Sequence, residues 1–169
     1  MKKIFLLSAL AILTSLSLKS QNCGTCTQSI NTHDTTSIVL NQGEILCIDT
    51  LGYFSGNITL NGGTICNKGF FKPSVLTINS GIITNYSNID IASTINASAT
   101  LTITNQDGAI FNIAGSLNII GGTITNNGIL NTDQAIVNTS GSFSNTSIVN
   151  CTTITGQTTI INTGVINAN

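Results

Sequence analysis

The chain has 169 residues, of which five are Lys or Arg, six are Asp or Glu, and 41% are hydrophobic. Beyond residue 20 only Lys68 and Lys72 carry positive charge, and with the six acids they give that part of the chain a net charge of −4. Nucleic acids and anionic bilayers both require clustered Lys and Arg, so this composition excludes them as partners. The hydrophobic content also argues against a disordered Asn-rich tract, which would lack side chains to bury.

Residues 1–20 have the pattern of a secretory signal peptide. Two lysines follow Met1, an apolar run covers residues 4–13, and the small residue Ser20 stands near the end. The apolar run is shorter than a membrane-spanning helix, which needs about 20 residues. Gln21 and Asn22 before Cys23 do not match the small-residue pattern that precedes a lipid-anchored cysteine. We therefore expect cleavage near residue 20 or 21, no membrane span afterwards, and a secreted or cell-surface protein.

Residues 21–56 are expected to form an N-terminal cap and a first irregular rung of a repetitive structure. The segment Leu40–Ile45 resembles the segment Leu60–Ile65 of the regular repeats twenty residues later. Such an array needs a cover at its open end. At the other end the chain stops at Asn169 inside the repeat pattern. An unprotected strand edge is a template for pairing, so we expect a longer repeat, a covering partner or end-to-end self-association there.

Residues 57–169 contain a repeat in which an apolar residue stands two places before an Asn. The six apolar residues are Ile65, Ile83, Ile103, Ile124, Phe143 and Ile160, and the six asparagines are Asn67, Asn85, Asn105, Asn126, Asn145 and Asn162. The asparagines lie 18, 20, 21, 19 and 17 residues apart, which gives a mean period of 19. Each unit holds about three short runs rich in β-branched residues, separated by turn-forming residues, and this composition favours strands.

This period predicts an all-β fold, a parallel β-helix (β-solenoid) with about 19 residues and three short strands per rung. One rung cannot bury its own apolar residues, but rungs stacked about 4.8 Å apart align them into an inner ladder. The asparagines suit the corners, where stacked amides can hydrogen-bond from rung to rung, although Asn is also a common turn residue. An antiparallel β-sandwich is the competing fold, but it does not require a fixed period.

Five cysteines in an exported chain predict disulfides. Cys47 and Cys66 are one rung apart, and neighbouring rungs bring Cα atoms within disulfide range. Cys23 and Cys26 could bond to each other, or each could bond to one of the other two, so the connectivity stays open. A zinc or redox site is not expected, because a second close pair and a βαβ context are missing. Cys151 is expected to be a buried filler, with an intermolecular bond as the alternative.

Polysaccharide lyases and hydrolases also use β-helices, so catalysis has to be considered. Asp90, Asp107 and Asp133 lie five, two and seven residues after their repeat asparagines, so they do not stack in one column. No arginine accompanies them, and His33 lies among Thr and Asp, as expected of a solvated loop residue. Carbohydrate-cleaving sites need clustered carboxylates. We therefore expect no enzyme activity and no catalytic, cofactor-binding or metal-binding residues.

Four threonines form a candidate binding face. Thr102 and Thr104 on one rung, and Thr123 and Thr125 on the next, would project paired hydroxyls outward. This arrangement resembles the Thr-x-Thr arrays of solenoidal ice-binding proteins, and a pair of serines continues it in part. The alternative is that Thr is simply a good exposed strand residue.

Over roughly residues 57–169 the Asn-, Thr- and Gly-rich rungs resemble the repetitive stalks of bacterial secreted and surface adhesins. The resemblance includes no family-specific motif, so it transfers no functional residues. It implies a non-catalytic structural or adhesive module whose ligand is a surface glycan or a protein. The alternative function is binding of ice or polysaccharide through an outward Thr/Asn face, and an enzyme ranks third.

Overall fold

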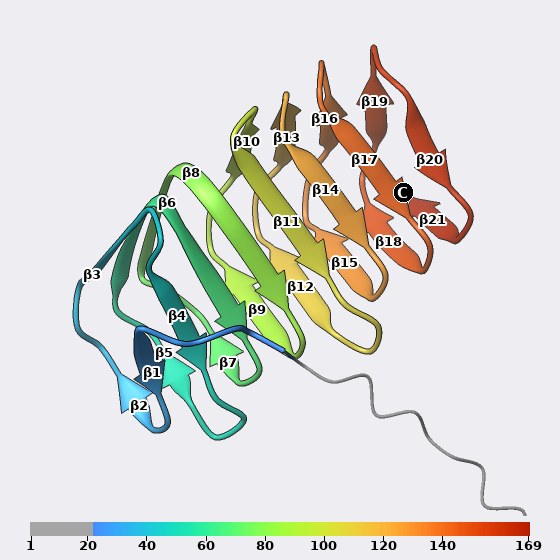
Figure 1. Ribbon diagram of the computed structural model, residues 1–169. Helices are drawn as coiled ribbons and strands as arrows, with labels where there is room; N and C mark the ends of the chain where they lie inside the picture. The colour runs from blue at the N-terminus through green and yellow to red at the C-terminus, as the bar shows by residue number, and fades with distance from the viewer. Residues whose placement is uncertain (1–21) are drawn as a thin grey trace, which may run out of the picture.

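The computed structural model describes residues 22–169, which form a parallel β-helix of about seven rungs with a repeat near 19 residues (Figure 1). The predicted all-β solenoid is confirmed. Its strands pair in parallel between neighbouring rungs, which excludes the antiparallel sandwich. The predicted signal peptide, residues 1–20, lies outside the described residues.

The strands form three sheets, and from β10 onward each sheet covers one side of the coil. Sheet A contains β1 (Gln28–Ile30), β3 (Ile38–Asn41), β4 (Ile45–Ile48), β6 (Asn57–Asn67), β8 (Val75–Asn85), β11 (Leu101–Asn105), β14 (Thr123–Asn126), β17 (Ser142–Asn145) and β20 (Ile160–Asn162). Sheet B contains β2 (His33–Asp34), β5 (Tyr53–Phe54), β7 (Phe70–Phe71), β9 (Asn88–Ile91), β12 (Ile110–Ile113), β15 (Ile129–Thr132), β18 (Ile148–Cys151) and β21 (Val165–Ala168). Sheet C contains β10 (Ile95–Ser98), β13 (Leu117–Ile120), β16 (Ile136–Asn138) and β19 (Ile154–Gly156).

The third side of the coil is built in two parts. In the early rungs β6 and β8 are 11 residues long, so each strand continues from the third side through a corner into sheet A. The first halves of β6 and β8 pair with each other, and that of β6 also pairs with β3, whereas sheet C begins one rung later at β10. A cleft of about 90 Å³ between the two parts is lined by Leu76, Ile78 and residues 93–96. The expected three strands per rung are separate in the rung of β3, β4 and β5 and in the later rungs, whereas in the rungs of β6 and β8 two of them are joined into one long strand.

A continuous apolar core runs along the axis. Alternate residues of a strand point inward, and the predicted inner ladder consists of consecutive register partners: Ile65, Ile83, Ile103, Ile124, Phe143 and Ile160. Ile83, Ile103 and Ile124 are only 0%, 2% and 3% exposed, and Ile160 at the last rung is partly buried. Burial of an Ile side chain contributes about 1.5–3 kcal/mol, so this ladder is a major source of stability.

Within the segment 21–56, expected as a cap with a first irregular rung, residues 28–54 contribute the five strands β1 to β5 in the same parallel arrangement. The similarity between Leu40–Ile45 and Leu60–Ile65 holds only before the corner. Leu40 pairs with Leu60, but a register shift at Asn41 then pairs Ile45 with Thr64. The corner between β3 and β4 holds one residue more than the corresponding corner in β6, so register partners are 20 residues apart before the corner and 19 apart after it.

Gly81 shows why the corner between the third side and sheet A needs glycine. Its φ of +134° is unfavourable for other residues. A Cβ there would lie 2.5 Å from the Gly63 carbonyl oxygen of the previous rung and 2.8 Å from Leu60. The corner thus depends on close backbone contact between rungs.

Candidate functional site

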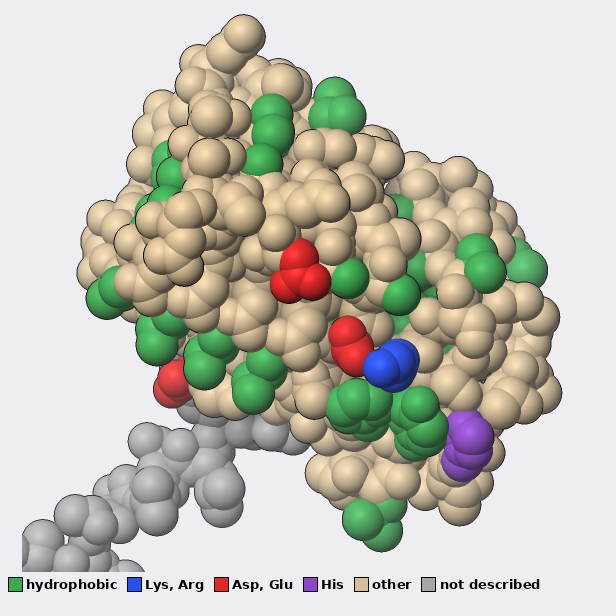
Figure 2. Space-filling model, turned by 180° about the vertical axis from the view of Figure 1, so that it is seen from behind, with side chains coloured by type: hydrophobic (Ala, Val, Ile, Leu, Met, Phe, Trp, Pro, Cys, Tyr) green, Lys and Arg blue, Asp and Glu red, His purple; other side chains and the backbone are tan. Residues whose placement is uncertain are grey.

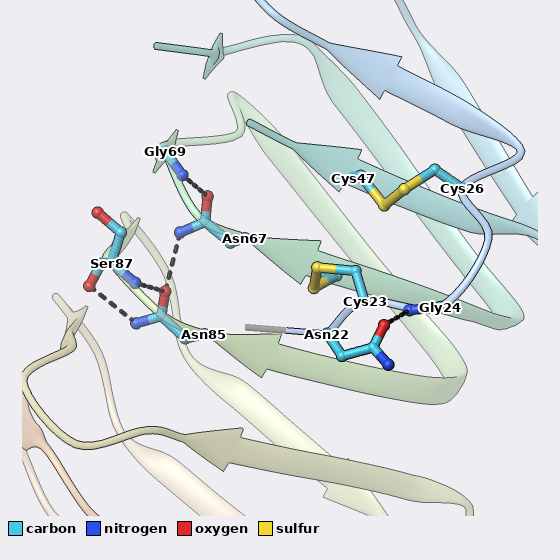
Figure 3. Close-up of a disulfide and its surroundings, with 10 residues drawn as sticks. Asn22, Cys23, Gly24, Cys26, Cys47, Asn67, Gly69, Asn85 and Ser87 are labelled. Atoms are coloured by element: carbon cyan, nitrogen blue, oxygen red, sulfur yellow. Dashed lines mark hydrogen bonds between the residues drawn. A yellow bond between two sulfur atoms is a disulfide. The ribbon is translucent and has the colours of Figure 1, made fainter. Parts of the chain in front are cut away.

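The predicted asparagine ladder lines one corner inside the coil, at the end of each later sheet A strand. Along the ladder each Nδ2 donates to the Oδ1 of the next asparagine, at 2.8, 2.9, 2.8, 2.7 and 2.7 Å. The same Nδ2 also donates to a backbone carbonyl of the next rung, for example from Asn85 to Ile110 at 2.9 Å. Asn67 accepts from the backbone N–H of Gly69 (Figure 3). All members except Asn162 are buried, so these amides hold rungs together and have little capacity left for a ligand.

A second asparagine ladder, on the outer face of sheet B, was not expected from the sequence. Asn131 donates to Asn112 at 2.8 Å, Asn150 to Asn131 at 2.7 Å, and Asn167 to Asn150 at 2.8 Å. We call these four residues the outer Asn ladder. The first three are partly exposed and Asn167 is exposed. Their spacings of 19, 19 and 17 residues, each after two apolar residues, are a sequence signal that could have found them.

An apolar stripe runs beside the outer Asn ladder. It is a column of register partners with one residue per rung: His33, Tyr53, Phe70, Asn88, Ile110, Ile129, Ile148 and Val165. Only Asn88 and His33 interrupt its apolar character. Ile148 and Val165 are 36% and 54% exposed. Figure 2 shows hydrophobic side chains in a row across this face, which ends at the histidine.

The threonine face predicted from the sequence lies on the outer side of sheet A. Thr102 pairs in register with Thr123, and Thr104 pairs with Thr125. The serines of β17 continue both columns on the next rung, and Thr84 extends one of them on the rung before. The other column is broken by the Ile at position 82, which is 44% exposed. The four predicted threonines therefore lie together as two in-register pairs.

Two disulfides join the N-terminal segment, residues 22–27, to the outer side of sheet A. Cys47 and Cys66 are register partners on β4 and β6, yet Cys47 bonds to Cys26 and Cys66 bonds to Cys23 (Figure 3). Of the alternatives left open by the sequence, each N-terminal cysteine therefore bonds to a different rung. Figure 1 shows the segment crossing the strands. The bonds close loops of 21 and 43 residues, which restricts the unfolded chain.

The charged groups are spread over the surface. Lys72 and Asp90 form an ion pair of 2.8 Å on sheet B, and this hydrogen bond raises the pKa of the Lys72 ammonium. The backbone N–H and the hydroxyl of Thr36, each 2.7 Å from Asp34 Oδ1, lower the pKa of that carboxyl. His33 is exposed and lies 2.8 Å from the Ser55 hydroxyl. These are local surface contacts.

Asp107 and Asp133 lie in separate turns outside the strands, while Asp90 lies on β9. The structure thus does not bring the three carboxylates into one column. Within residues 22–169 no three His, Cys, Asp or Glu side chains gather in a way that could hold a metal ion. Cys151 has no disulfide partner and is buried on β18, where burial raises the pKa of its thiol.

Among the described residues there is no helix with the length and apolar character needed to cross a membrane. No protein-family model matches the chain, and neither a curated protein nor a solved structure shows detectable similarity to it. The geometry of the faces is therefore the basis for any functional conclusion. It defines the chain as a β-solenoid with regular ladders inside and outside the coil.

Proposed function

We propose that the chain is a non-catalytic structural or adhesive module that acts outside the cell, either secreted or on the surface. The observation that supports this most strongly is that the outer faces of sheets A and B carry columns in which similar residues recur on successive rungs. The outer Asn ladder and the threonine face are the main examples. A column of this kind suits an extended or repetitive partner, which it can engage at many points at once.

The construction also suits a rigid spacer. Each rung contacts only its neighbours, and backbone pairing, the apolar core and the buried asparagine ladder all join one rung to the next. Two disulfides strengthen the N-terminal rungs, and such bonds persist in oxidising compartments. Self-association through the last strands, β20 and β21, stays a prediction.

Expression of the full chain, including residues 1–20, in the source cells tests this proposal. We expect the protein in the medium or accessible to protease at the cell surface, with only Cys151 reacting with a thiol reagent after unfolding. A chain that stays inside the cell with all five cysteines reactive would contradict the proposal.

The threonine face supports a second candidate function, the binding of ice. The in-register pairs Thr102–Thr123 and Thr104–Thr125 form a regular two-by-two array of threonines on neighbouring rungs. Replacement of Thr104 and Thr125 by Leu should abolish thermal hysteresis, whereas Thr155→Leu on sheet C should not change it. Absence of thermal hysteresis in the unmodified protein would refute this second function.

A further inference from the structure

The outer face of sheet B combines two columns of different chemistry in one regular surface. Within each strand, the apolar stripe and the outer Asn ladder are two residues apart, as Ile129 and Asn131 show. Residues at this spacing lie roughly 7 Å apart on the same face, and neighbouring rungs are about 4.8 Å apart. From His33 to Val165 the stripe covers seven rung steps, roughly 34 Å at that spacing.

The amides of the outer Asn ladder keep hydrogen-bonding capacity for a ligand. Asn131 uses one N–H to reach Asn112 and one lone pair to accept from Asn150. A side-chain amide has two N–H groups and two acceptor lone pairs, so one of each stays available. In the buried ladder Asn105 instead donates to an asparagine and to backbone carbonyls. The outer amides are therefore held in position by one another while they still offer a donor and an acceptor.

The apolar stripe places exposed hydrophobic side chains on the same surface. Ile110 and Ile148 are each 36% exposed, and Tyr53 and Phe70 continue the stripe with ring centroids 5.3 Å apart. An exposed apolar surface of this length is a feature of interaction sites. Lys72 and Asp90 neutralise each other beside the stripe, and from β7 to β21 the strands of sheet B contain no other charged residue. The exposed carboxylate of Asp133, in the turn after β15, adds one negative charge at the edge of the face and disfavours an anionic partner. A suitable partner is uncharged, extended, and has both apolar and hydroxyl groups.

We propose that the outer face of sheet B binds an uncharged polysaccharide chain that lies along the solenoid axis. The C–H faces of the sugar rings pack on the apolar stripe, and their hydroxyls exchange hydrogen bonds with the outer Asn ladder. The amides are already ordered by the ladder, so binding costs less side-chain entropy than it would for free side chains. This inference rests on the proposed adhesive function and names its partner and its surface.

Depletion isotherms of the purified, disulfide-bonded protein test the proposal. The probes are microcrystalline cellulose, insoluble chitin and an insoluble β-1,3-glucan, with cross-linked polygalacturonate as the charged comparison. We expect saturable binding to at least one of the three uncharged polymers. Ile129→Lys and Asn131→Asp should each weaken that binding roughly tenfold, since each places a charge under the bound sugar.

Two substitutions on sheet C provide matched controls. Val137→Lys lies on the same rung as Ile129, and Asn118→Asp alters a separate ladder in which Asn118 donates to Asn96 at 2.9 Å. Both should bind like the unmodified protein. Thermal unfolding followed by circular dichroism verifies that each variant is folded. If Ile129→Lys does not fold, the isosteric variant Asn131→Asp alone tests whether this face binds the polysaccharide.

Three results would overturn the proposal: no saturable binding to any uncharged polymer, binding to polygalacturonate alone, or equal losses in the sheet C controls. A dimer that Ile129→Lys dissociates, with no polysaccharide bound, would assign the face to a second copy of the chain instead. If the protein is found outside the cell but binds no polysaccharide, this inference is wrong and the proposed structural or adhesive function is unaffected. If the protein stays inside the cell, both proposals are wrong.

Discussion

Removal of one amide from the middle of the buried asparagine ladder should destabilise the protein strongly. Asn105 is 2% exposed, accepts from Asn85 at 2.9 Å and donates to Asn126 at 2.8 Å. Asn105→Ala leaves an N–H of Asn85 and the Oδ1 of Asn126 buried without these partners. Each unsatisfied buried group costs about 1–3 kcal/mol, so the expected loss is about 2–6 kcal/mol. Such a loss is a large fraction of the free energy of unfolding of a typical domain, which is about 5–15 kcal/mol.

Urea unfolding followed by far-UV circular dichroism measures this loss as a change in the free energy of unfolding. The matched control is Asn162→Ala at the exposed end of the same ladder, where water can replace the hydrogen bonds from Asn145 and to Gly164. We expect that variant to lose less than about 1 kcal/mol. Equal losses in the two variants would refute the reasoning that burial makes the ladder stabilising.

Three further predictions concern the cysteines and a corner glycine. Cys26→Ser should lower the free energy of unfolding by about 3 kcal/mol in urea titrations, because it opens a 21-residue loop; an unchanged midpoint would contradict this. Cys151 should react with iodoacetamide far more slowly in the native than in the unfolded protein. Burial raises the pKa of the Cys151 thiol, so the stability linked to it is present below the thiol's ordinary pKa of about 9 and is lost as the pH rises through the higher folded value. Gly81→Ala should cost more than about 2 kcal/mol by clash and backbone strain, and Gly43→Ala, with open space around its Cβ, about 1 kcal/mol.

The repeat itself was predictable because its strongest signals lie at one corner. Each asparagine of the buried ladder ends a sheet A strand, and the apolar residue two places before it points to the core. Loops elsewhere in the rung vary in length, so the spacing ranges from 17 to 21 residues while the register at the corner is kept. Local chemistry and long-range stacking agree there, which is why the period identified the fold.

Other features depend on contacts that the period does not contain. Residues 22–27 have no repeat partner, so their path across sheet A, and with it the pairing of Cys23 and Cys26, could not be chosen from spacing. The division of the third side between β8 and β10 likewise has no counterpart in the repeat pattern. The outer Asn ladder is a different case, because its motif of two apolar residues and an Asn recurs in the sequence and could have been found; the hydrogen bond from Asn131 to Asn112 is seen only in the structure.

Methyl–methyl nuclear Overhauser effects in Ile-labelled protein test the stacked core most directly. Ile103 is the register partner of Ile83 on one side and of Ile124 on the other, and all three are buried. We predict cross-peaks from the Ile103 δ1 methyl to both neighbours, because adjacent rungs lie about 5 Å apart. Absence of both cross-peaks in the folded protein would contradict the parallel coil on which the account of its surfaces depends.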